Sequence, residues 1–191
     1  MYVAGDDPYC YPGTAILRNI RDIRDPDALE AFEFAMSQQR STEPLPEGRF
    51  DVAHYKALHR HLFQDVFEWA GEMRTVNISK GASTFCFAQF VASEMKRVFA
   101  DLAERNLLRG RDRADFASAA AHFLVELNAI HPFREGNGRT QLLFLRELSR
   151  EADHGLDFSN LDPDEALGAA IAGFHGDEAP MRKLIDKLVV N

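Results

Sequence analysis

A short break in helical spacing, at Gly136, Asn137 and Gly138, constrains this chain more than any other feature of its sequence. Apolar residues recur at helical intervals over residues 116–127 before the break and over residues 143–148 after it. An Asn-Gly pair also favours a tight hairpin turn, but the flanks lack the alternating apolar spacing of strands. Because glycine-flanked amides at a helix N-terminus can form a concave nest for phosphate oxygens, the sequence predicts two helices joined by a phosphate-binding loop.

Most of the remaining chain is also predicted to be helical. Asp25 and Asp51 are typical N-cap residues, and each precedes apolar residues at helical spacing. Pro163 follows Asp162 in the way that favours a first helical turn, so a helix is expected there, before a polar break and a last helix. The other helical patterns lie at residues 25–39, 51–63, 91–102, 116–130 and 140–151.

Residues 75–87 have a different pattern. Two short stretches rich in β-branched and aromatic residues flank a turn at Lys80 and Gly81, which predicts a small hairpin. At 191 residues and 46% hydrophobic composition, the chain has the length of one domain with one substantial core. We therefore expect an all-α fold, a single domain over residues 1–191, which carries a small β-hairpin at about residues 73–88.

Charge and composition restrict the partners. A net charge of -8 and a pI near 5.3 argue against nonspecific binding to nucleic acid, so a protein partner is the better expectation. No apolar run is long enough to span a bilayer, and the first residues do not form a basic-then-apolar signal segment. Cys10 and Cys86 have no companions at metal-binding spacing, so neither a disulfide framework nor a zinc site is suggested. We expect a soluble cytoplasmic protein that binds neither nucleic acid nor membrane.

Residues 131–142 place a base, a carboxylate and a cation within one short stretch. His131 follows a predicted helix, and an imidazole titrates near neutral pH, so it can accept a proton from a hydroxyl group. The alternative is a structural histidine that caps the preceding helix. Positive charge gathers here, so a locally basic pocket is expected, although Arg134 and Arg150 could instead lie on a solvated helix face.

The order and spacing of this stretch resemble the signature of the Fic family. That signature runs His-x-Phe-x-Asp/Glu-Gly-Asn-Gly-Arg, and seven constrained positions agree in register from His131 to Arg139. The resemblance covers most of the chain, since residues 9–14, 69–71 and 74–76 also look familial. The short first segment is most similar to bacterial toxins of the FicT type.

The resemblance implies a protein adenylyltransferase, which uses ATP and Mg²⁺. In such an enzyme His131 is the general base, and Glu135 holds the magnesium ion between phosphates. Without the resemblance, a lone glutamate in a loop would more often be solvated. The family pattern assigns the phosphate contacts to Gly136, Asn137, Gly138 and Arg139.

The predicted hairpin matches the flap of the family, which pairs with an extended segment of the target protein through its backbone. An ordinary surface hairpin with phenylalanines anchored in the core is the alternative. Gly138 favours transfer of AMP, because the Doc-like members that transfer phosphate carry lysine at this position. The flap residues that we expect to contact the target are Lys80, Gly81, Thr84 and Phe85.

One position departs from the family signature: Leu142 stands where the family has a second arginine. That arginine contacts the γ-phosphate and pairs with an inhibitory glutamate, and leucine can do neither. Arg146, one helical turn later, is the candidate substitute. A second function therefore stays open, a catalytically attenuated Fic fold that acts as a binding module.

The resemblance also implies two protein partners. FicT-type toxins are inhibited by a small separate antitoxin, whose helix carries Ser/Thr, three residues, Glu and then Gly or Asn. This chain has no match to that motif, because the segment nearest to it, residues 42–48, is one residue too long and contains Pro44 and Pro46. The expected targets are subunits of bacterial type II topoisomerases, DNA gyrase or topoisomerase IV.

Overall fold

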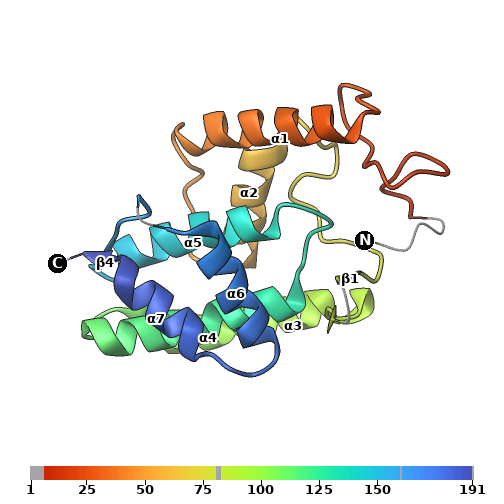
Figure 1. The fold of residues 1–191 in the computed structure, drawn as a ribbon. Helices are drawn as coiled ribbons and strands as arrows, with labels where there is room; N and C mark the ends of the chain where they lie inside the picture. The colour runs from red at the N-terminus through yellow and green to blue at the C-terminus, as the bar shows by residue number, and fades with distance from the viewer. Residues whose placement is uncertain (1–6, 81–82, 160, 191) are drawn as a thin grey trace.

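Helices make up most of the fold, as a computed structural model shows for residues 7–80, 83–159 and 161–190 (Figure 1). They are α1 (Pro26–Ser41), α2 (Val52–Phe63), α3 (Ala88–Glu104), the 3-10 turn η1 (Asn106–Leu108), α4 (Arg113–Ile130), α5 (Asn137–Glu151), α6 (Pro163–Phe174) and α7 (Ala179–Leu188). In Figure 1, α1 and α2 lie above α5, whereas α3 and α4 lie below it. The mainly helical fold expected from the sequence is thus confirmed.

Aspartate side chains begin several of these helices. Asp25 accepts a hydrogen bond from the Ala28 N–H at 2.8 Å, and Asp51 accepts one from the His54 N–H at the same distance. Asp162 caps α6 in the same manner. Each satisfies an N–H group that has no acceptor within the first helical turn, which is why the predicted starting points agree with the structure.

Helix α4 is the centre of the core. It packs against α3, α5, α6 and α7, while α1 reaches the core through α2. Among the described residues, no helix is both long and apolar enough to cross a membrane. The bulkiest fully buried side chains are Tyr55, Phe63, Phe67, Phe116, Phe133 and Phe144.

The flap hairpin is present but shorter than predicted. Strand β1 (Ser79–Lys80) pairs antiparallel with β2 (Ser83–Thr84). The arms end early because the carbonyls of Val76 and Cys86 accept hydrogen bonds from Arg74 instead of from the opposite arm. A second pair, β3 (Gly155–Leu156) with β4 (Val189–Val190), was not predicted, since two-residue strands leave no periodic pattern.

Arg74 joins this hairpin to the end of α4. Its guanidinium is buried and donates to the carbonyls of His131 at 2.8 Å and Ile130 at 3.1 Å, besides the two carbonyls in the hairpin arms. The last carbonyls of a helix lack partners within the helix and carry partial negative charge, so a buried cation is well suited to this place. The flap and the loop after α4 therefore share one anchor.

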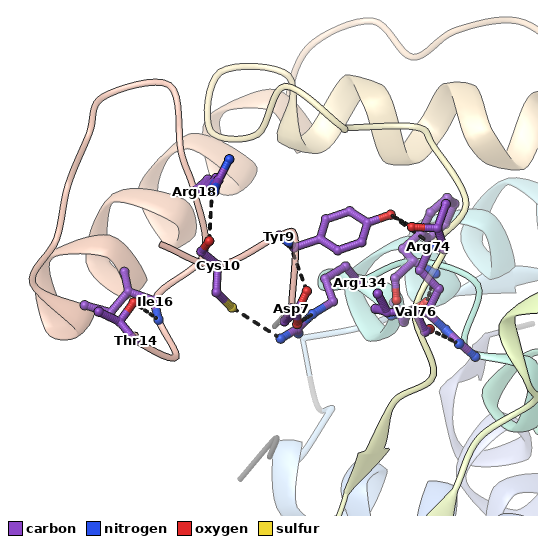
Figure 2. A network of polar contacts seen from close by, with 12 residues as sticks. Asp7, Tyr9, Cys10, Thr14, Ile16, Arg18, Arg74, Val76 and Arg134 are labelled. Atoms are coloured by element: carbon purple, nitrogen blue, oxygen red, sulfur yellow. Dashed lines mark hydrogen bonds and ion pairs between the residues drawn. The ribbon is translucent and has the colours of Figure 1, made fainter. Parts of the chain in front are cut away.

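The N-terminal segment lies across the same loop (Figure 2). Asp7 forms an ion pair with the buried Arg134 at 2.8 Å, and the Cys10 sulfur lies 3.8 Å from the same guanidinium. The Tyr9 hydroxyl accepts a hydrogen bond from the Thr75 N–H at 3.1 Å. Arg134 is thus a structural residue in the interior rather than part of a solvated helix face.

We expect Arg74→Ala to lower the free energy of unfolding by about 3 kcal/mol or more, because four backbone carbonyls lose the charged donor that a buried guanidinium provides. Urea denaturation measures this loss. The exposed Arg105→Ala, which breaks an i,i+4 pair with Asp101, is the control and should cost about 0.5 kcal/mol. Equal losses in the two variants would contradict the anchoring role of Arg74.

Candidate functional site

A cavity of about 560 Å³ opens between the flap and helices α4 to α7. Its polar lining includes His131, Glu135 and the start of α5, with Lys80 from the flap, Asn128 from α4 and Gln141 from α5. The rest is apolar, and α5, α6 and α7 supply most of it. Phe85 lines the cavity as well, so six of the site residues expected from the sequence meet there, whereas Gly136, Arg139 and Thr84 do not line it.

His131 ends α4 in a left-handed backbone conformation, with φ 51° and ψ 63°. Such a conformation is unfavourable for a residue with a Cβ, and it turns the chain sharply out of the helix. The Nδ1 atom lies 3.3 Å from the Asn128 carbonyl, which can only accept, so Nδ1 carries the proton. The lone pair of Nε2 is therefore available to a ligand. His131 both caps the helix and presents a base, so the two readings of its sequence are compatible.

The surroundings of His131 keep its imidazole neutral. Burial lowers its pKa to about 4, and the positive charges of Arg74 and Lys80 act in the same direction. Phe85 stacks on the ring with centroids 4.0 Å apart, and only 7% of this phenylalanine is exposed. Phe85 therefore forms a wall of the site. Its burial agrees with the alternative in which the hairpin phenylalanines are anchored in the core.

Gly136 is required by both backbone geometry and space. Its φ is 80°, and a Cβ added there would lie 2.4 Å from the Phe63 ring. Helix α5 begins directly after it at Asn137, three residues earlier than the predicted start at residue 140. Asn137 and Gly138 therefore belong to the first helical turn, where backbone N–H groups have no acceptor within the helix. Free N–H groups at the start of a helix are suited to bind an anion.

The side chain of Asn137 has a structural position. Its Oδ1 accepts from the Phe133 N–H at 3.0 Å, and its Nδ2 donates to the Phe133 carbonyl at 2.8 Å. The residue is only 2% exposed. The amide group of Asn137 therefore closes the loop, and the phosphate contact expected at this position is left to backbone N–H groups.

Glu135 is half-buried at the rim of the cavity, where its Oε1 accepts from the Gly136 N–H at 2.9 Å. His59, on α2, holds the backbone of the loop that carries Glu135. The His59 Nδ1 accepts from the Gly71 N–H at 2.8 Å, so its Nε2 is the proton donor to the Glu135 carbonyl at 3.0 Å. His59 also stacks on Phe133 at 3.7 Å, and burial lowers its pKa to about 3.

Arg139 points toward α1 instead of into the main cavity. Its guanidinium forms an ion pair with Glu33, donates to the Ser37 hydroxyl at 3.1 Å and lies 4.7 Å from the Phe63 ring centroid. Glu33 is 8% exposed, and burial raises its pKa although Arg139 opposes this effect. Sequence analysis missed Glu33, because no local pattern connects α1 with the loop. The arginine that should bind a phosphate thus already has a carboxylate partner.

Leu142 lines the apolar part of the cavity, as its chemistry dictates. Arg146 does not take the place of a second arginine, because its Nε pairs with Glu147 at 3.1 Å. Arg150 also pairs with Glu147 and is exposed, as expected for a solvated helix face. Among the described residues that line this cavity, Lys80 is therefore the only lysine or arginine.

The flap residues occupy different environments. Lys80 and Thr84 are exposed, and Thr84 pairs with Ser79 across the hairpin. Gly81, which was expected to contact the target, lies outside the described residues.

Residues 49–149 match the model of the Fic/DOC family. The chain belongs to the Fic/DOC family. A relative from Sinorhizobium fredii, the probable protein adenylyltransferase y4lH, is 50% identical over 189 residues, and the match covers 98% of both chains. The probable protein adenylyltransferase Fic of Escherichia coli is 34% identical, with 97% of this chain and 93% of that protein covered.

A longer Fic protein is similar over part of its length. The protein adenylyltransferase VbhT of Bartonella schoenbuchensis is 38% identical over 187 residues, which are 96% of this chain but 39% of VbhT. Two solved Fic structures contain a nucleotide. The N-terminal Fic domain of a Bartonella quintana effector with bound ADP has a TM-score of 0.89 at 30% identity, and 96% of this chain and 94% of that one are covered. BepC of Bartonella tribocorum with bound AMPPNP has a TM-score of 0.86 at 29% identity and 96% coverage of both.

Acid should destabilise this Fic domain through its buried histidines. The folded protein keeps His59 neutral down to about pH 3, whereas the unfolded chain binds a proton near pH 6.5. Stability should therefore fall as the pH is lowered from 6.5, by up to about 1.4 kcal/mol per pH unit for His59. Urea denaturation at a series of pH values measures the slope.

The His59→Gln variant removes the titrating group, so we expect lower stability at pH 7 and a flatter dependence on pH between 6.5 and 4. His175→Gln, at an exposed position, is the matched control and should keep the wild-type slope. An unchanged slope in His59→Gln would show that His59 does not cause the loss.

Proposed function

We propose that this chain transfers AMP from ATP to a hydroxyl side chain of a target protein. The observation that carries the proposal is the neutral imidazole of His131, which shares a cavity with Glu135 and the amide end of α5. The relatives named protein adenylyltransferases support the reaction class. The relatives with bound AMPPNP and ADP support a nucleotide in this cavity.

In the proposed reaction, the hydroxyl oxygen of the target attacks the α-phosphorus of ATP. The proton of that hydroxyl passes to Nε2 of His131, because this nitrogen holds the free lone pair of the ring. The bond between the α-phosphorus and its bridging oxygen to the β-phosphorus breaks, and pyrophosphate leaves. The N–H groups at the start of α5 point toward the negative charge on the phosphates and stabilise it as the transition state forms.

The residues present suit both a nucleotide and a magnesium ion. A Cβ added at Gly138 would meet no atom within 4 Å, so the backbone there is open to a close ligand. The apolar wall of α6 and α7 suits a flat base. Glu135 is the carboxylate in place to hold magnesium, which would supply charge neutralisation between phosphates.

The flap is the proposed docking edge for the target. Lys80 lines the cavity from the hairpin, and Thr84 is exposed on the second strand. A short edge strand can pair with an extended segment of another protein and so bring a side chain of that segment to His131. The proposed targets are subunits of DNA gyrase or topoisomerase IV, by analogy with FicT-type toxins.

We propose that a small antitoxin inhibits the protein. The proposal depends on the absence of the inhibitory motif from this sequence and on the similarity to FicT-type toxins. Because Leu142 offers no ion pair to an inhibitory glutamate, such an antitoxin would depend on other contacts at the cavity.

Leu142 is the observation that favours a second candidate function. With leucine there and Arg139 paired with Glu33, the site has fewer free cations than the family pattern implies. A catalytically attenuated Fic fold that binds a partner is therefore the alternative. A Doc-like phosphotransferase is less favoured, because Gly138 stands where those proteins carry lysine.

Incubation of the protein with ATP, magnesium and purified topoisomerase subunits or lysate proteins should yield a target whose intact mass has increased by one AMP. The His131→Ala variant should yield no adduct, because the general base is lost. His175→Ala, at an exposed position, is the control for the substitution itself. A phosphate-sized adduct would instead identify a phosphotransferase, and the absence of any adduct would favour the binding function.

Leu142→Arg should strengthen ATP binding roughly 10- to 100-fold, since a charge-assisted contact to a phosphate is worth about 1.5 to 3 kcal/mol. AMP binding should change little, because AMP lacks the outer phosphates. Titration calorimetry measures both affinities, and Leu142→Met is the matched apolar control. Equal ATP affinity in the arginine and methionine variants would show that position 142 does not contact the outer phosphates.

A further inference from the structure

Gln141 is a polar residue in the cavity that the proposed reaction does not use. It lies on α5 one helical turn after Asn137, and it lines the same cavity as His131 and Glu135. Only 8% of the residue is exposed. Its side-chain Nε2 is buried, and no hydrogen-bond partner for it exists among the described residues.

A buried amide donor without an acceptor is unusual and destabilises a folded protein. The neighbouring polar residues of α5 do not have this defect. Asn137 bonds to the backbone of Phe133, and the hydroxyls of Thr140 and Ser149 donate to the carbonyls of Gly136 and Arg146. The donor of Gln141 is thus an exception on its own helix.

None of the described residues that line the cavity accepts a hydrogen bond from Gln141. Leu142 and Leu145, which line the cavity from the same helix, are aliphatic. The Asn128 side chain on α4 donates through its Nδ2 to the Ala170 carbonyl at 3.1 Å, and its amide oxygen does not accept from Gln141. A molecule that enters the cavity can supply the acceptor that Gln141 lacks.

We propose that Gln141 is a further nucleotide-binding residue, whose Nε2 donates to an oxygen of the sugar-phosphate part of the nucleotide. The inference rests on the proposed function, which brings ATP into this cavity. With the phosphates at the start of α5 and the base against α6 and α7, the ribose and the α-phosphate lie between those two places. Gln141, one turn below Gly138, belongs to the wall of that region.

Gln141→Met tests the assignment, since methionine has a similar length but no donor. We expect two opposite changes: a higher Tm for the nucleotide-free protein, because the unsatisfied donor is gone, and AMP binding weakened roughly 10-fold. Thermal unfolding and titration calorimetry measure them. Gln38→Met, at an exposed position of α1, is the matched control and should change neither.

Adenosine separates the two possible acceptors. Weaker binding of AMP but not of adenosine would place the bond at a phosphate oxygen, whereas weaker binding of both would place it at a ribose hydroxyl. Either result supports the assignment. Gln141→Glu, which also lacks a donor and adds negative charge, should weaken AMP binding further and covers the case in which the methionine variant does not fold.

Two outcomes would overturn the inference, and they can be told apart. If wild type binds AMP and both Gln141 variants bind it equally well, the assignment of Gln141 is wrong while the proposed function stands. If wild type binds neither AMP nor ATP with magnesium, the proposed function itself fails, and the role of Gln141 fails with it.

Discussion

The geometry of the site depends on one buried cation, the guanidinium of Arg74. It donates to backbone carbonyls at the end of α4 and in both arms of the flap, segments that are far apart in the sequence. Because the guanidinium is planar and rigid, these carbonyls hold fixed positions relative to one another. The base on His131 and the edge strand of the flap are consequently positioned by the same group. A lysine could not replace it, since an ammonium has no such planar fork of donors.

The electrostatics of the site differ from those of the whole molecule. The whole chain has a net charge of -8. The site itself carries little free charge, because the imidazoles of His59 and His131 are neutral and Arg139 is paired with Glu33. The groups in the cavity that are suited to attract an anion are therefore the N–H groups at the start of α5 and Lys80. Binding of a highly charged nucleotide without counter-charge is unfavourable in such a place. This arrangement explains why a divalent cation beside Glu135 belongs to the proposed reaction.

Local signals in the sequence identified most of the fold. Capping aspartates and helical spacing located the helices, and the order of residues from His131 to Arg139 identified the family. Features that depend on distant contacts could not be found in this way. Glu33 reaches Arg139 from another helix, and the inward position of the Asn137 amide results from packing against the Phe133 backbone. The predicted start of α5 was late because glycine and asparagine are poor helix formers, whereas tertiary contacts at Gly136 and Asn137 fix the first turn.

The left-handed backbone at His131 affects which substitutions a selection for thermal stability would favour. Glycine adopts this conformation without strain, and asparagine tolerates it better than most residues. A screen that rewards thermal stability alone should therefore enrich glycine or asparagine at position 131, and each would delete the proposed base. Stability and the proposed role of His131 as a base therefore exert opposite pressures on this one residue.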